Sequence, residues 1–259
     1  MRGFTLVELV MVIVLLGILS VGMVQFISHA SFGFASTAAR TELASSARIA
    51  LERVALELRS SLPNSVRDAD GRCIEYIPAL GASRYLTLPI EDPARSFRSM
   101  PMGPGLVVDG RRIAVYPDTP GNVYALSSIS VVSPPADFSL PDAGNVVTAT
   151  FAAPHRFPNE SPRKRFFAVG DPVSFCVSGG RLWRYEGYGY EEVQPTVATL
   201  PAALPQRALV AENISPTSTP FRFRRATLLR NATVAIDLLL ENHGDQIRID
   251  RVVQLRNVP

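Results

Sequence analysis

Residues 2–24, RGFTLVELVMVIVLLGILSVGMV, decide the fold, and one carboxylate in them is unexpected. A helix over Phe4–Ile27 is about 36 Å long, which exceeds the roughly 30 Å hydrocarbon core of a bilayer. The only side chains in it outside the apolar and glycine set are those of Thr5, Glu8, Ser20 and Gln25. The run therefore predicts a membrane-spanning helix over residues 4–27, and Arg2 favours a cytoplasmic N-terminus.

A cleaved secretory signal and a plain single-pass membrane anchor are the two alternatives to a segment with a specific function. A cleaved secretory signal has an apolar region of only about 7–15 residues, although Ser36–Ala38 is a suitable small-residue cleavage site. Neither alternative needs an acid at position 8, and a carboxylate inside a membrane costs roughly 2–3 kcal/mol on insertion scales. Glu8 is therefore expected to have a function and a partner; the alternative is an acid tolerated near the helix end.

The partner of Glu8 is not in the apolar run, which contains no Lys, Arg or His. A cation would arise nearby if the chain were cut just before Phe4, and Gly3 is small enough for such a cut. Gly3-Phe4-Thr5-Leu6-Val7-Glu8, followed by an apolar helix, resembles the N-terminal signature of type IV pilins and type II secretion pseudopilins.

The resemblance implies a processing step and a role for Glu8. A prepilin peptidase at the cytoplasmic face would remove leader residues 1–3 by cutting between Gly3 and Phe4, and Phe4 would be N-methylated. Glu8 would then pair with the N-terminal amine of a neighbouring subunit. A buried acid and a buried amine are each costly alone and tolerable together, so the pair would set the register of subunits in a filament.

An amphipathic helix is expected over residues 28–62. Pro63 ends it, and Arg48–Glu52 and Arg53–Glu57 have the i,i+4 spacing of ion pairs. Apolar residues recur at three- and four-residue steps along one face at Leu43, Ala47, Ala50, Val54 and Leu58. This stripe is expected to pack on a sheet of the same chain.

Residues 63–259 are expected to form a β-rich globular head, because short strand patterns alternate there with turn signals. One hairpin is predicted over 106–117, turning at Asp109–Gly110, and another over 172–187, turning at Gly179–Gly180. Further strands are predicted over 122–132, 145–154, 233–242 and 245–258. The last two flank His243–Gly244, and in the first of them Val234, Ile236, Leu238 and Leu240 share one face.

The predicted fold class is α+β, with a long N-terminal helix packed on one or more antiparallel sheets. Proline-rich stretches near Pro134 and Pro195 are expected to be surface loops. Apolar residues make up 47% of the chain and charged residues 19%, which is typical of a packed domain rather than a disordered tail. The net charge of +3 is too small to indicate nucleic-acid binding by itself.

The two cysteines, Cys73 and Cys176, both lie in strand-like sequence. An exported periplasmic domain permits disulfides, so a Cys73–Cys176 bond is favoured over two buried free thiols. Closing a loop of this length would stabilise the head by at most roughly 4–5 kcal/mol.

No enzymatic motif, metal or cofactor is predicted. Zinc-protease, nucleophile-elbow and phosphate-loop patterns are absent, and His29, His155 and His243 are scattered. Glu241, Asn242 and Asp245 are attributed to turn chemistry rather than to a calcium site. The basic clusters at Arg163–Arg165 and at Arg222, Arg224 and Arg225 are interpreted as solvated faces rather than a nucleic-acid surface.

Three looser stretches, residues 51–67, 155–176 and 227–234, resemble the MshO-type minor pilins of the mannose-sensitive haemagglutinin (MSHA) pilus. The resemblance implies a non-enzymatic subunit of the inner membrane with a periplasmic head, which enters a pilus. Its partners would be other pilin subunits, the prepilin peptidase, the inner-membrane assembly platform and membrane lipid.

Two alternatives stay open. The chain could be a J-like type II secretion pseudopilin, or the rod could carry an adhesive domain. A sugar could then stack on an aromatic surface of Trp183, Tyr185, Tyr188 and Tyr190, although aromatic residues on a hairpin more often pack across strands.

Overall fold

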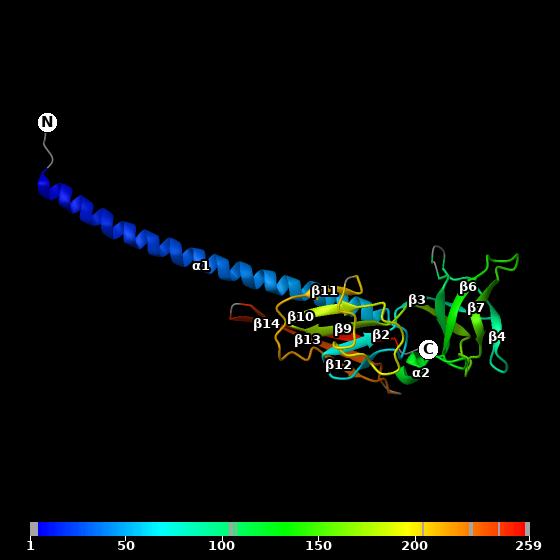
Figure 1. The fold of residues 1–259 in the computed structure, drawn as a ribbon. Helices are drawn as coiled ribbons and strands as arrows, with labels where there is room; N and C mark the ends of the chain where they lie inside the picture. Colours follow the sequence, from blue (N-terminus) through cyan, green and yellow to red (C-terminus); the bar gives the residue numbers. More distant parts are fainter. Residues whose placement is uncertain are drawn as a thin grey trace. The chain divides into compact units, whose positions relative to one another are not determined.

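The chain divides into two compact units, Met1–Ser45 and Ser46–Pro259, which are described separately. The computed structural model describes residues 5–103, 106, 108–203, 205–227, 230–242 and 244–256, without the side chains of 32, 35 and 36. Its elements are a long helix, a short helix and fourteen strands in three antiparallel sheets (Figure 1). The α+β prediction is confirmed.

Helix α1, Leu6–Arg59, is continuous over 54 residues, and no proline interrupts it (Figure 1). In the second unit its predicted apolar stripe is buried, because Ala47, Ala50, Val54 and Leu58 each have no exposed surface. Small alanines let the helix lie close to the strands beneath it. This part of α1 is therefore a core element of the head.

Helix α1 ends at Arg59, earlier than the predicted end at residue 62. The backbone beyond it bonds instead to Ile77 and to the start of strand β3, Ala79–Arg84: Leu62 N donates to Ile77 O (2.7 Å), and Ala79 N donates to Ser60 O (2.9 Å). The chain thus leaves the helix to form a bridge between Ser61 and Pro78. A long-range pairing, rather than Pro63, sets the helix end.

A five-stranded sheet has the order β1-β2-β9-β10-β11. Its strands are β1 Arg67–Asp68, β2 Cys73–Tyr76, β9 Val173–Ser178, β10 Arg181–Tyr185 and β11 Arg207–Ala211. Strands β9 and β10 form the predicted hairpin, with Arg181 opposite Ser178. Gly179 and Gly180 have φ of 57° and 69°, and this positive-φ pair matches the twist of a two-residue hairpin turn.

A three-stranded sheet has the order β12-β13-β14. Its strands are β12 Phe221–Arg224, β13 Thr233–Asn242 and β14 Asp245–Gln254. The C-terminal strand pair is confirmed, with Thr233 opposite Gln254 and Asn242 opposite Asp245. Val234, Ile236, Leu238 and Leu240 are completely buried, as their alternation predicts. At the turn, Gly244 has φ of 89°, and His243 lies outside the described residues.

A six-stranded sheet has the order β3-β8-β5-β6-β7-β4. Its strands are β3 Ala79–Arg84, β4 Ala94–Ser99, β5 Arg111–Ala114, β6 Val132–Phe138, β7 Val147–His155 and β8 Arg165–Val169. The two outer strands also meet: Met100 N donates to Arg84 O (2.9 Å), and Leu86 N donates to Arg98 O (2.7 Å). The sheet therefore closes on itself at this end as a small barrel, with a bridge between Tyr85 and Ser99.

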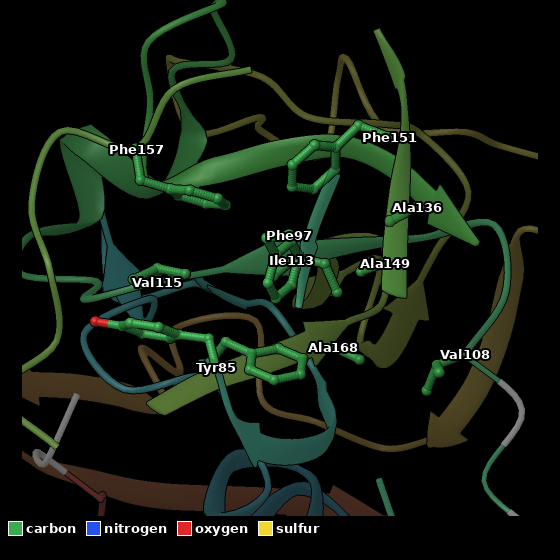
Figure 2. Packing of buried hydrophobic residues seen from close by; sticks show 11 residues of the cluster. Tyr85, Phe97, Val108, Ile113, Val115, Ala136, Ala149, Phe151, Phe157 and Ala168 are labelled. Atoms are coloured by element: carbon green, nitrogen blue, oxygen red, sulfur yellow. The ribbon is translucent and has the colours of Figure 1, made fainter. Parts of the chain in front are cut away.

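Aromatic rings and small side chains fill this barrel (Figure 2). The ring of Phe97 stacks on that of Phe151 with centroids 5.5 Å apart, and it meets Phe166 edge-on at 5.4 Å. Figure 2 shows Ala136, Ala149 and Ala168 among the packed side chains. Their small size leaves room for the rings, so large and small residues interlock across the interior.

The hairpin predicted over 106–117 is wrong. Strand β5 pairs with β6 on one edge and with β8 on the other, so neither edge is free for the residues before the turn. The turn itself is present, since Gly110 has φ of 71°. Val108 instead packs into the barrel core, and Val107 lies outside the described residues.

The strand predicted over 122–132 is largely wrong, because it begins in helix α2, Pro120–Tyr124. Pro120 stands at the start of the helix, where its missing N–H is not needed. The side chain of Asn122 donates to Asp118 Oδ1 (2.9 Å), and Val123 and Tyr124 are buried. Only Val132 enters a strand, β6.

The loop predicted near Pro134 is also wrong, since Pro134 and Pro135 lie within β6. Pairing of β6 with β7 begins only at Ala136, so neither proline occupies a paired position on that edge. Towards β5, Ile113 N donates to the Ser133 hydroxyl (3.0 Å), so a side chain takes over one backbone bond. The stretch after Pro195 lacks strand or helix in its described residues, as predicted.

The predicted disulfide is present. Cys73 of β2 stands directly opposite Cys176 of β9, with Cα atoms 4.2 Å apart. Such a distance is typical of a closely spaced antiparallel pair. The bond joins positions 103 residues apart, at the centre of the five-stranded sheet.

We expect the double substitution Cys73→Ala with Cys176→Ala to lower the free energy of unfolding of the full chain by about 2–5 kcal/mol, because the unfolded chain regains loop freedom. Trp183 is the only tryptophan, so its fluorescence in detergent-solubilised protein reports unfolding of the head. Reduced wild-type protein serves as the control and should match the variant. A loss below about 1 kcal/mol would contradict the expectation.

Candidate functional site

Among the described residues, one helix segment is long and apolar enough to cross a membrane, Leu6–Ser31. It has 26 residues and a mean hydropathy of 2.7, and its most apolar 18-residue stretch is not buried against other parts of the chain. Predicted processing residues Gly3 and Phe4 lie outside the described residues. The structure therefore locates the span and its carboxylate but not the cleavage site.

Polar side chains within this span bond to their own helix. The Ser20 hydroxyl donates to Leu16 O (2.7 Å), and His29 Nδ1 lies 2.8 Å from Gln25 O. Such local bonds partly satisfy groups that would otherwise face hydrocarbon without a partner. They are compatible with membrane insertion.

Glu8 lies in the first turn of α1, next to Thr5. Thr5 directly precedes the helix, and its hydroxyl accepts a bond from Glu8 N (3.4 Å) and donates to Glu8 Oε2 (3.4 Å). Thr-x-x-Glu at a helix start has the spacing of a capping box. Here the Thr5 hydroxyl caps the N–H of Glu8, and the Glu8 carboxylate accepts a bond from that hydroxyl. A carboxylate is also favoured there by the helix dipole.

This cap is a second role for Glu8 that the sequence reasoning missed. The signal was available, because Thr5 and Glu8 have the required three-residue spacing before an apolar run. Both bonds are long, at 3.4 Å, so the cap is a weak one. The carboxylate keeps acceptor capacity for a second partner.

The second polar site lies where α1 meets strands of the head. Glu57 of α1 accepts bonds from the Tyr76 hydroxyl of β2, from Arg184 Nε of β10 (2.8 Å) and from Arg53 Nε of its own helix (3.3 Å). Burial alone would raise the pKa of Glu57, but these hydrogen bonds and the charge of Arg184 outweigh it and lower the pKa below its ordinary value. The carboxylate thus joins helix and sheet.

A second link involves Glu52, which contacts Arg251 of β14. The sequence offered Arg48 as the i,i+4 partner of Glu52, whereas the predicted Arg53–Glu57 pair is present. The three contacts from Glu52 and Glu57 tie α1 to β2, β10 and β14. Two different sheets are therefore fixed to the same helix.

Glu75 of β2 is the fully buried acid of the head. It pairs with Arg67 of β1, and the Tyr188 hydroxyl donates to it (3.0 Å). Burial dominates and raises the pKa of Glu75, although Arg67 and Tyr188 oppose the shift. Arg67 also lies 3.6 Å over the Tyr124 ring and donates to the carbonyls of Glu191 and Glu192, so this network is internal.

The four aromatic residues proposed as a ligand surface are engaged inside the head. Tyr185 is buried, and Tyr188 shares a hydrogen bond with Ser174 (2.8 Å). Tyr190 donates to Gly170 O (3.0 Å), and Trp183 stacks on the Arg207 guanidinium at 4.1 Å. Their faces and hydroxyls contact protein groups, so the structure gives no support to a stacking platform made by all four.

Histidines do not gather into a site among the described residues. His155 is buried between the rings of Phe151 and Phe157 and bonds to Ser130 O (3.0 Å), whereas His29 lies on α1. Burial lowers the pKa of His155 despite that bond. Within the described part of the chain no group of three His, Cys, Asp or Glu side chains is placed to hold a metal.

Comparison with known proteins gives one match. The family described as "Prokaryotic N-terminal methylation motif" matches residues 1–24. No curated protein and no solved structure matches the chain. The chain therefore carries the class III signal peptide and methylation motif of type IV pilin-like proteins, and the motif includes Thr5 and Glu8.

We expect Glu57→Gln to lower the free energy of unfolding by about 1–3 kcal/mol near neutral pH, because charged hydrogen bonds are lost. The lowered pKa means that this contribution is complete above the ordinary carboxyl pKa of 4.5 and disappears as the pH falls through the folded-state value. Denaturation followed by Trp183 fluorescence at several pH values measures the difference from wild type.

The matched control is Glu186→Gln, which removes the more exposed partner of Arg184. It should cost no more than about 1 kcal/mol, as exposed pairs do. A Glu57→Gln deficit that stays constant down to acid pH would show that the charge of Glu57 does not stabilise the head.

Proposed function

We propose that this chain is a minor pilin, held in the inner membrane by α1 and incorporated into a type IV pilus with its head exported. The methylation motif at residues 1–24 carries the proposal, because it runs directly into the apolar helix segment Leu6–Ser31. A prepilin peptidase would cut between Gly3 and Phe4, and Phe4 would be N-methylated. The disulfide fits a periplasmic head.

The finer assignment is to a minor pilin of the MSHA system. Its support is the resemblance of residues 51–67, 155–176 and 227–234 to MshO-type subunits. A J-like pseudopilin of type II secretion is the second candidate, since it would share the same motif and processing. The two candidates differ in their partner subunits and assembly platform rather than in local chemistry.

The proposed role is structural rather than enzymatic. Pilin-like proteins are generally structural subunits, and the half-buried Glu57 and the buried Glu75 have partners within the head. Their arrangement fixes helix and strands to one another. The head would contribute to pilus assembly through its shape and its surface.

Glu8 is proposed to pair with the N-terminal amine of Phe4 from a neighbouring subunit. Its bond to Thr5 is long and leaves acceptor capacity on the carboxylate. In a membrane an unpaired amine and an unpaired acid would both be costly, so a correctly placed neighbour is favoured over a misplaced one. The helix cap needs the hydrogen-bonding groups of Thr5 and Glu8, whereas the ion pair needs the charge of Glu8. Substitutions at the two positions can therefore distinguish the two roles.

Glu8→Gln keeps a residue that suits a capping box but removes the charge, whereas Thr5→Ala removes the capping hydroxyl but keeps the carboxylate. We expect Glu8→Gln to lower incorporation into surface filaments by at least about tenfold with normal membrane levels, because the amine loses its counter-charge. Thr5→Ala should stay close to wild type. Immunoblots of sheared filaments and of membranes measure both.

The reverse pattern would overturn the pairing role. If Thr5→Ala loses incorporation and Glu8→Gln does not, then the helix cap made by Thr5 controls assembly and the charge of Glu8 does not. Equal incorporation of both variants and wild type would show that neither side chain controls assembly.

A further inference from the structure

An open groove of about 960 Å³ lies in the head where the end of α1 adjoins strands β3, β8 and β14. Four arginines line it, Arg59, Arg163, Arg165 and Arg256, and the lining residues that the structure describes include no carboxylate. These arginines come from three distant parts of the chain. The sequence alone predicts a solvated basic cluster at Arg163 and Arg165, and it gives no signal that Arg59 or Arg256 lies near them.

The charge of these arginines is largely uncompensated. In the described part of the chain none of the four makes an ion pair, whereas Arg67, Arg184, Arg248 and Arg251 each contact a carboxylate. Arg59 is the exception in one respect, because it stands in the last turn of α1, where the helix dipole favours a cation. Arg163, Arg165 and Arg256 have no such compensation.

Strand pairing concentrates the charge further. The register of β3 and β8 places Arg84 directly opposite Arg165, and residues directly opposite share one face of the sheet. Like charges in this position are destabilising in the absence of a counter-ion. An anionic ligand would relieve this repulsion.

Apolar residues also line the groove, and they narrow the class of ligand. Pro63, Phe167 and Leu255 are buried, whereas Leu56 is 67% exposed and open to contact. An inorganic anion would use the arginines but not Leu56. Single-stranded nucleic acid would need exposed rings on which bases stack, and the ring of Phe167 is only 8% exposed.

We propose that this groove binds an acidic peptide segment of a partner protein, with an apolar side chain against Leu56 and carboxylates on the arginines. Guanidinium groups suit this ligand because they hold carboxylates through paired, directional hydrogen bonds. The groove is larger than a single anion requires and lies within the range of ligand sites. This inference goes beyond the proposed function and does not depend on processing at Gly3.

The test uses the full chain in detergent and a fluorescent peptide of alternating glutamate and leucine. Fluorescence anisotropy should show saturable binding that weakens with salt. A matched peptide with glutamine in place of glutamate should bind at least about tenfold more weakly. Inorganic phosphate and heparin serve as competitors that carry negative charge without a peptide.

The test variant is Arg163→Ala with Arg256→Ala, since both side chains are exposed and the unfolding midpoint followed by Trp183 should not change. We expect it to weaken peptide binding by at least about tenfold. Arg222→Ala with Arg224→Ala is the matched control: it removes two exposed arginines of β12 outside the groove, and it should bind like wild type. Arg163→Lys with Arg256→Lys should retain part of the affinity.

Four results would overturn the proposal. The peptide could fail to bind, or it could bind the Arg163→Ala, Arg256→Ala variant as well as it binds wild type. Displacement of the peptide by phosphate at equal concentration would identify a site for small anions. Tight heparin binding without peptide binding would identify a polysaccharide surface.

Discussion

The head depends on the buried face of α1 between Ala47 and Leu58. Its alanines bring the helix backbone close to the strands, and this face has no exposed surface at Ala47, Ala50, Val54 or Leu58. Around that apolar contact, Glu52 and Glu57 bind side chains from β2, β10 and β14. Apolar burial supplies the attraction, and the directional polar contacts fix one orientation of the strands against the helix.

Two acids of the head show how environment decides the effect of a carboxylate. Glu57 is partly exposed and has three donors, so its pKa is lowered and its charge stabilises the fold. Glu75 is completely buried, and desolvation raises its pKa against the effect of Arg67. Folding therefore favours protonation of Glu75 and opposes protonation of Glu57. The contribution of Glu75 to the free energy of unfolding falls as the pH rises, whereas the contribution of Glu57 falls as the pH is lowered.

Local sequence patterns predicted the elements whose partners are adjacent along the chain. The glycine pair at Gly179–Gly180 correctly predicted the β9–β10 hairpin, and the alternation of apolar residues in 233–242 correctly predicted the buried face of β13. Local patterns gave wrong predictions where strands pair with distant parts of the chain. Strand β5 lies between β6 and β8, and the outer strands of the six-stranded sheet meet near Arg84 and Arg98. The groove arginines were missed for this reason too, because three separate segments bring them together.

The N-terminal segment matches the methylation motif over residues 1–24 and forms an apolar helix from Leu6 onward, and we propose that it is processed as a pilin signal. Mass spectrometry of the N-terminal peptide from native membranes tests it most directly. The account predicts a peptide that begins with N-methylated Phe4. A peptide that begins at Met1 would indicate a plain anchor, and one that begins near Ala39 would indicate a released periplasmic domain; either would contradict the account.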